Sequence, residues 1–166
     1  MPISADHRRV VIADAGPLIA LGRLDRLDLL PRLFTEVQVT ATVVMECLAR
    51  PGLPDAVRIA AALDAGHLCK CPDPDLDAEV RLDPGESSAI ARALEIGAGL
   101  VMDDRAGVAH ARAQGLRVIG TLGILVLAKQ KSLIPQVRPL LERLRDDGHY
   151  LGDAAILTAL ALAGEE

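Results

Sequence analysis

The chain has 166 residues, of which 51% are hydrophobic and 25% are charged, and its formal net charge is −5. A chain of this length and composition can bury a full core in one domain, which excludes an intrinsically disordered or disulfide-dependent protein. The acidic balance argues against a simple nucleic-acid-binding module with a basic surface, although it leaves room for an enzyme with a local arginine patch.

The cysteines and apolar segments are typical of a cytoplasmic protein. Cys47, Cys69 and Cys71 are odd in number and lack the spacing of a secreted disulfide framework, so we expect reduced thiols. The apolar tail over residues 154–162 is far shorter than the roughly 20 residues needed to cross a bilayer. We therefore expect a cytoplasmic location and no membrane partner.

The first apolar run, over residues 10–13, predicts a strand that is buried on both faces. Asp14 ends this strand, and Pro17 is typical of the first turn of a following helix. The next predicted elements are a helical segment over 24–34 interrupted at Pro31, a strand over 37–40, and a helix that is capped by Thr40 or Thr42 and runs through Leu48. They are followed by a helix over 55–65, a strand over 67–71, a polar connection over 72–83 and a helix that begins at 83–86. The last part of the chain predicts strands over 100–102 and 116–119, and helices over 105–114, 124–129, about 135–145 and 153–163.

Strands that alternate with helices predict an α/β fold, here a three-layer αβα arrangement around a mainly parallel, twisted sheet of about five strands. We expect a single domain over residues 1–166, with a core over about 10–145 and a C-terminal helix over 153–163. In such a sheet the carboxyl ends of the strands meet at one edge, where ligands bind.

Carboxylates recur at the predicted strand-to-helix junctions, at Asp14, Glu46, Glu86, Asp103 and Asp104. Gathered at one edge they would repel one another, so either some are protonated or a cation holds them ionised. Mg²⁺ and Mn²⁺ suit an oxygen-only site, whereas the scattered histidines give no zinc spacing. The pattern therefore favours a divalent-metal site.

Each carboxylate also has a purely structural interpretation. Asp14 and Asp104 could be plain helix N-caps. Glu86 could complete a capping box with Asp83. Glu46 could pair with Arg50 one turn along its helix.

Several stretches resemble the PIN domain, in particular PIN-like toxin nucleases of toxin–antitoxin pairs. They lie in the family's order over about residues 10–145, and they are Val11–Leu21, Val43–Glu46, Pro84–Ala91, Leu100–Asp104 and Gly115–Leu125. The resemblance implies a PIN-like fold and a Mg²⁺- or Mn²⁺-dependent ribonuclease that leaves a 5′-phosphate and a 3′-hydroxyl. The implied catalytic acids are Asp14, Glu46, Glu86 and Asp104, and the implied metal ligands are Asp14, Glu86, Asp103 and Asp104, with Asp103 and Asp104 competing for the last place.

The resemblance also implies partners, namely an RNA substrate, an antitoxin protein and a second copy of the chain. Arg23, Arg50 and Arg105 are expected to contact the RNA backbone. The homodimer surface is expected on the aliphatic helices over 24–34 or at the C-terminus. Because the chain has few aromatic residues, we expect selectivity to come from RNA shape and polar contacts more than from base stacking.

Two departures from the family pattern favour an alternative, a catalytically weak or inactive PIN-like interaction module that acts through a partner protein. The family often has a hydroxyl residue after its first Asp, where this chain has Ala15 and Gly16. Related chains often have an Arg where this chain has Val108. A metal-dependent phosphatase of the halo-acid type is disfavoured, since the first strand does not end in a D-x-D pair.

Overall fold

The computed structural model describes residues 9–76 and 81–166. Within these residues the chain forms one five-stranded sheet, in the order β3-β2-β1-β4-β5, and every pairing is parallel. The strands are β1 (Val10–Ala13), β2 (Glu36–Thr40), β3 (Cys69–Cys71), β4 (Gly99–Val101) and β5 (Val118–Ile119). The helices are α1 (Ala15–Arg23), α2 (Leu29–Leu33), α3 (Ala41–Cys47), α4 (Pro54–Asp64), α5 (Pro84–Ile96), α6 (Arg105–Ala113), α7 (Thr121–Gln130), α8 (Arg138–Asp146) and α9 (Asp153–Leu162).

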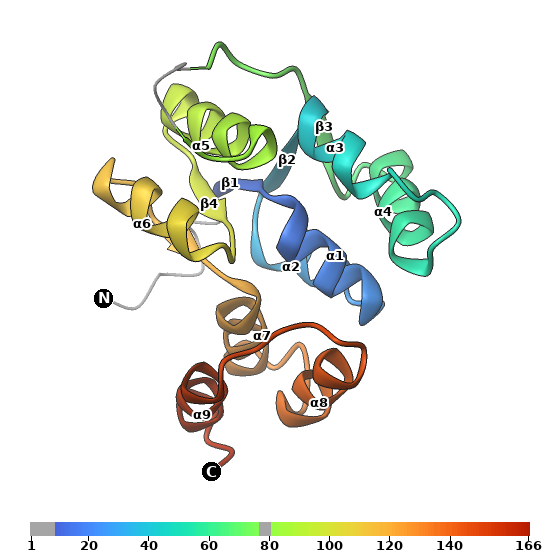
Figure 1. Cartoon of the computed structure of the whole chain (residues 1–166). Helices are drawn as coiled ribbons and strands as arrows, with labels where there is room; N and C mark the ends of the chain where they lie inside the picture. Colours follow the sequence, from blue (N-terminus) through green and yellow to red (C-terminus); the bar gives the residue numbers. More distant parts are fainter. Residues whose placement is uncertain (1–8, 77–80) are drawn as a thin grey trace.

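The two faces of the sheet pack into separate cores, which confirms the three-layer αβα prediction. Val11 and Ala13 of β1 belong to the larger core, which is shared with α1, α2, α3, α4 and the C-terminal helices. Ile12, between them, belongs to a smaller core built with α5 and α6. This alternation follows from the period of two along a strand, because successive side chains point to opposite faces. Figure 1 shows the helices arranged around the sheet in this way.

Most element boundaries agree with the sequence prediction, and the largest difference is in the region over 24–34. Only α2 forms there, because residues 24–28 make a turn in which the amide of Arg26 donates to the carbonyl of Leu21. The leucines of this region are nevertheless buried in the larger core. The helical spacing of these leucines therefore predicted their burial correctly, but it predicted a helix longer than α2.

The C-terminal helices extend the larger core beyond the sheet. Helix α7 contacts α1, α2 and α9, and Figure 1 shows α7, α8 and α9 as a group on one side of the sheet layer. Within the described ranges, no helix has both the length and the apolar character needed to cross a bilayer.

Candidate functional site

Asp14 is the most buried carboxylate at the carboxyl edge of the sheet, with 6% of its surface exposed. Its backbone N–H donates to the carbonyl of Val101 at 2.9 Å, which ties the end of β1 to the end of β4. Asp14 holds the N-cap position of α1, but its side chain accepts no capping hydrogen bond. The carboxylate is therefore not used as a helix cap, so the plain N-cap interpretation fails here.

The pKa of Asp14 is raised from 3.8 to about 7, mainly by burial. The Ala15 amide opposes this rise, and the negative charges of Asp83, Glu46 and Asp104 contribute to it. Carboxylates from three other segments thus act on one buried group. The geometry brings together acids that lie up to 90 positions apart in the chain (Asp14 and Asp104).

Glu86 lies in the first turn of α5, two residues after Pro84. Proline is well tolerated at the start of a helix, because the backbone N–H groups there have no partner within the helix. The side chain of Asp83 caps this helix by accepting from the backbone N–H of Glu86 at 2.8 Å. Partial burial raises the pKa of Glu86 to about 8, and Asp83, Asp104 and Asp14 add to the rise. This bond is the Asp83 half of the capping box that the D-x-x-E spacing predicts. It places Glu86 at the acidic edge, the name used below for the carboxylates of Asp14, Glu46, Asp83, Glu86 and Asp104.

Asp83 itself is an additional carboxylate at the edge. Its charge raises the pKa of Asp14, Glu46 and Glu86. From the sequence, Asp83 is predicted only as a helix cap for the residues that follow it. The signal that could have revealed it is its position at the start of the same helix as Glu86, three residues before that acid.

Glu46 reaches the edge from α3, where its carboxylate lies against Gly85 of α5. A Cβ built on Gly85 would lie 2.8 Å from Cδ and 2.9 Å from Oε2 of Glu46, closer than real Cβ contacts allow. Partial burial and the charge of Asp83 raise the pKa of Glu46. No ion pair joins Glu46 to Arg50 among the described residues.

Asp104 comes from the end of β4 and caps α6, since its Oδ2 accepts from the backbone N–H of Gly107 at 2.8 Å. A Cβ on Gly107 would lie 3.5 Å from Oδ2 of Asp104 and 3.6 Å from Oε2 of Glu86. The two carboxylates therefore flank the same small space beside Gly107. Asp104 is both a helix cap and a member of the acidic edge.

Asp103, the adjacent residue, is engaged elsewhere. Its Oδ1 accepts from the backbone N–H of Thr121 at 2.7 Å, and its Oδ2 accepts from the Thr121 hydroxyl at 2.5 Å. These bonds cap α7, whose own N-cap residue Gly120 has no side chain to do so. They also explain why α7 begins at Thr121, three residues before the predicted start. Asp103 and Asp104 were both candidates for the last metal ligand. The hydrogen bonds of Asp103 to Thr121 give it a structural role at the start of α7.

A buried pair of hydroxyls connects α3 and α5 beneath the edge. Thr40 caps α3, and its Oγ1 lies 2.7 Å from Oγ of Ser88, with both residues fully buried. Ser88 also donates to the carbonyl of Gly85 at 2.8 Å. The pair fixes the helix that carries Glu46 relative to the helix that carries Glu86. Thr40 was one of two predicted candidates for this cap, with Thr42, and its partner Ser88 was not predicted.

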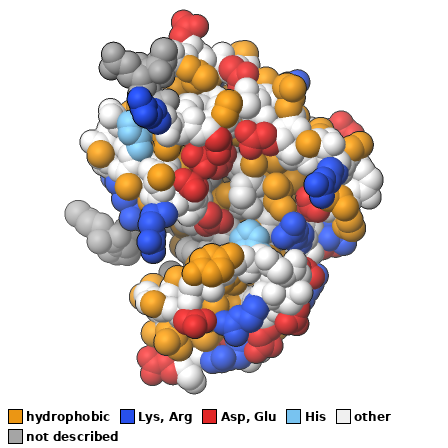
Figure 2. All heavy atoms as spheres, viewed as in Figure 1, with side chains coloured by type: hydrophobic (Ala, Val, Ile, Leu, Met, Phe, Trp, Pro, Cys, Tyr) orange, Lys and Arg blue, Asp and Glu red, His pale blue; other side chains and the backbone are white. Residues whose placement is uncertain are grey.

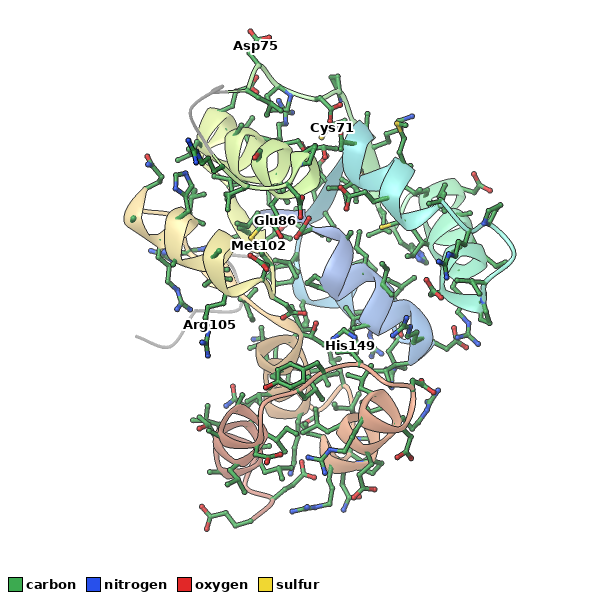
Figure 3. The ribbon with its side chains drawn as sticks, in the orientation of Figure 1. Cys71, Asp75, Glu86, Met102, Arg105 and His149 are labelled. Atoms are coloured by element: carbon green, nitrogen blue, oxygen red, sulfur yellow. The ribbon has the colours of Figure 1, made fainter. Side chains whose placement is uncertain are left out.

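The three arginines expected to contact RNA lie at different distances from the edge. Arg105 begins α6, directly after Asp104, and Figure 3 shows it projecting from that end of the helix. Arg50 follows α3 and is exposed. Arg23 ends α1, roughly 12 Å along the helix axis from its start at 1.5 Å per residue. Of these three arginines, only Arg105 is adjacent in sequence to one of the acids, Asp104.

The chemistry of the donor set fits a hard divalent cation. Asp14, Glu46, Asp83, Glu86 and Asp104 offer only carboxylate oxygens, and among residues 9–76 and 81–166 none of them forms an ion pair with Lys, Arg or His. Figure 2 shows Asp and Glu side chains gathered at the centre of the molecule's face. As positioned, however, no three His, Cys, Asp or Glu side chains of the described residues form a group that could hold an ion. The site therefore offers the ligand atoms that a hard cation prefers, but within the described residues these atoms are not close enough together to coordinate one ion.

Comparisons with known proteins agree with this fold. The family model described as DUF3368, PIN domain, matches residues 10–165. Among solved structures, the PilT N-terminus domain protein SSO1118 from the hyperthermophilic archaeon Sulfolobus solfataricus P2 is 20% identical, with a TM-score of 0.55 over 72% of this chain and 92% of that chain. No curated protein matches the chain. At 20% identity the likeness to this solved structure concerns the fold alone. The residues matched by the family model, 10–165, include all the carboxylates of the acidic edge.

Proposed function

The chain belongs to the PIN-domain family, and from that premise we propose that it is a divalent-metal-dependent endoribonuclease. PIN domains are typically nucleases and generally use divalent metals. The single observation that supports the proposal best is the gathering of carboxylates from the ends of β1 and β4 and from α3 and α5. Their negative charges raise the pKa of Asp14, Glu46 and Glu86, and within the described residues none of them has a cationic side chain as an ion-pair partner. Such an arrangement is unfavourable in a purely structural role.

We propose Asp14, Glu46, Glu86 and Asp104 as the catalytic acids, with Asp14, Glu86 and Asp104 holding Mg²⁺ or Mn²⁺. Asp14 is held by β1 and its pairing to β4, so it is the fixed member of the set. Glu46, Glu86 and Asp104 are more exposed than Asp14. A bound divalent ion would lower the pKa of a water molecule and offset negative charge on the scissile phosphate.

The raised pKa values determine which acids carry protons before a metal binds. At pH 7 a carboxyl with a pKa of about 8, such as Glu86, is mostly neutral. Asp14, with a pKa of about 7, is then about half protonated. Metal binding must displace these protons, since only the carboxylate is a strong ligand for a hard cation.

For substrate binding we propose Arg105 as the phosphate contact nearest to the acids, and Arg50 and Arg23 as contacts to more distant parts of the RNA. Arg105 is exposed at the start of α6, beside Asp104. Phosphate contacts of this kind hold the backbone without reading its sequence.

Cleavage of a structured RNA in the presence of Mn²⁺ tests the proposal directly. We expect the wild-type protein to cleave and Asp14→Asn to be inactive, because the amide cannot replace the buried carboxylate. Asp55→Asn is a matched control, since Asp55 is also buried, at 8% exposed, but lies at the start of α4. Equal cleavage by wild type and Asp14→Asn would overturn the assignment.

We further propose that the protein is the toxin of a toxin–antitoxin pair, with a partner protein that covers the acidic edge. Induced expression in bacteria should then arrest growth, and Asp14→Asn should relieve the arrest. Normal growth with soluble, active wild-type protein would contradict the toxin role and leave the nuclease activity intact.

A homodimer through α9 is proposed as the assembly. Leu157 and Leu162 are 68% and 64% exposed on this apolar helix, whereas the leucines of region 24–34 lie in the core and are not available. Sedimentation equilibrium should show a dimer that Leu157→Asp converts to a monomer. A monomeric wild-type protein would contradict this assembly.

The alternative is an inactive PIN-like interaction module, and it is favoured by the absence of a closed group of ligands in the described part of the chain. Calorimetric titration with Mn²⁺ separates the two functions. Binding that is lost in Asp14→Asn supports the nuclease, and no binding at millimolar Mn²⁺ supports the module.

A further inference from the structure

The connection between α8 and α9 carries the only tyrosine in the chain, Tyr150, and 91% of its surface is exposed. Burial of an aromatic ring stabilises a folded protein, so a ring left almost wholly in water contributes little to this fold. The other aromatic side chain, Phe34, packs against the larger core. Tyr150 is therefore available for a contact outside the folded chain.

The backbone around Tyr150 is held at both ends. Gly148 adopts a left-handed conformation, with φ of 81°, and closes α8. The N–H of His149 donates to the carbonyl of Leu144 at 2.9 Å. On the other side, Leu151 packs against the larger core. A ring presented on anchored backbone loses less conformational entropy when it binds a ligand than a ring on a free loop.

The connection lies on the same face as the acidic edge. Figure 3 shows His149 in the segment that joins α8 to α9, and the same view shows the side chains of Glu86 and Arg105. In the same orientation, Figure 2 shows a hollow between the acidic patch and the part formed by α7, α8 and α9, with a histidine and basic side chains around it. Tyr150 directly follows His149 in the same connection, and its side chain is almost wholly exposed.

We propose that Tyr150 stacks on an unpaired base of the RNA substrate, next to the phosphate that the acidic edge would cleave. The proposal rests on the nuclease function proposed above and identifies a substrate-positioning residue for it. A phenol ring suits this role because every base presents a π-face, and such stacking tolerates different sequences. It also implies that the substrate has a single-stranded segment at the cleavage site.

The composition of the chain allows a direct test by fluorescence. With one Tyr and no Trp, the intrinsic emission of the protein comes from Tyr150 alone. We expect a short uridine oligonucleotide, added with Ca²⁺ in place of Mn²⁺, to quench this emission to a saturating level. An abasic oligonucleotide of the same length should not, and N-acetyltyrosinamide corrects for absorption by the bases. No saturable quenching, or equal quenching by the abasic strand, would overturn the proposal.

Kinetics on variants provide a second test. Stacking of one base predicts that Tyr150→Ala weakens RNA binding roughly 5- to 150-fold and raises KM, with little change in kcat. Tyr150→Phe keeps the ring and should bind like wild type. Val57→Ala, at a 55% exposed position on α4, is a control that should change neither constant. Unchanged KM in Tyr150→Ala would also overturn stacking.

The two proposals can fail separately. Quenching without RNA cleavage would remove the nuclease function and leave a base-binding surface. Cleavage that depends on Asp14, together with a Tyr150→Ala variant identical to wild type, would remove the stacking role and leave the nuclease.

Discussion

The carboxylate of Glu46 occupies the space beside Gly85 that any other side chain would fill. Gly85 is buried in the first turn of α5, one residue before Glu86, so the contact joins two of the proposed catalytic acids across two helices. The Thr40–Ser88 hydrogen bond of 2.7 Å holds the same two helices together below it. The acidic edge thus depends on a glycine that carries no chemistry of its own.

Gly85→Ala should separate stability from activity. Alanine favours a helix by up to about 1 kcal/mol over glycine, so the free energy of unfolding should stay the same or rise. The added Cβ must displace the flexible Glu46 side chain, so RNA cleavage should fall. Thermal unfolding and cleavage assays on the same preparations give both values.

A double-mutant cycle with Glu46→Ala shows whether this effect acts through Glu46. If it does, Gly85→Ala should reduce activity far less in the Glu46→Ala background than in the wild type. An equal loss in both backgrounds would contradict the contact.

Asp104→Asn should weaken Mn²⁺ binding and Asp103→Asn should not, although the two residues are adjacent. Asparagine is as good an N-cap as aspartate, so Asp104→Asn should preserve α6 while it removes a negative charge from the acidic edge and weakens Mn²⁺ binding and cleavage. Asp103→Asn should retain Mn²⁺ affinity, because both oxygens of Asp103 are bonded to Thr121. Calorimetric titration with Mn²⁺ measures the difference.

Asp103→Ala extends this comparison to stability. The variant removes both hydrogen bonds to the start of α7 and should cost about 1–2 kcal/mol in the free energy of unfolding. Urea unfolding of wild type, Asp103→Ala and Asp103→Asn measures it. A stability equal to wild type in Asp103→Ala would show that the cap is dispensable.

Asp14 should make the metal-free protein less stable as pH rises. Its pKa is 3.8 in an unfolded reference and about 7 in the fold, so the folded state binds the proton more tightly. The stability from this proton is fully present below pH 4 and is lost as pH rises through 7. The loss is on the order of 4 kcal/mol. Chemical unfolding between pH 4 and 8 should show it, and Asp14→Asn should have a flatter profile.

Mn²⁺ binding should release protons and strengthen with pH. Asp14 and Glu86, whose pKa values are about 7 and about 8, must both ionise to act as ligands. The apparent affinity should therefore rise between pH 6 and 8. Titration in two buffers of different ionisation enthalpy measures the protons released. A pH-independent affinity with no proton release would contradict the involvement of these two acids.

The sequence by itself determined the local structure of the acidic edge. The apolar run of β1 with Asp14 at its end, the caps at Thr40, Asp83 and Asp104, and the alternation of strands and helices are all set by residues within about four positions of one another. These local patterns were enough to predict the parallel sheet and the edge at which the carboxylates meet.

Only the tertiary structure decided what each carboxylate does there. Asp103 and Asp104 are equivalent in sequence, yet Asp103 bonds to Thr121, eighteen positions away, while Asp104 turns toward Glu86. Asp83 joins the acids, and Glu46 fits beside Gly85, through contacts between segments that no local pattern connects. The physical reason is that the environment of a side chain is set by whichever distant segment packs against it, and that packing exists only once the chain has folded.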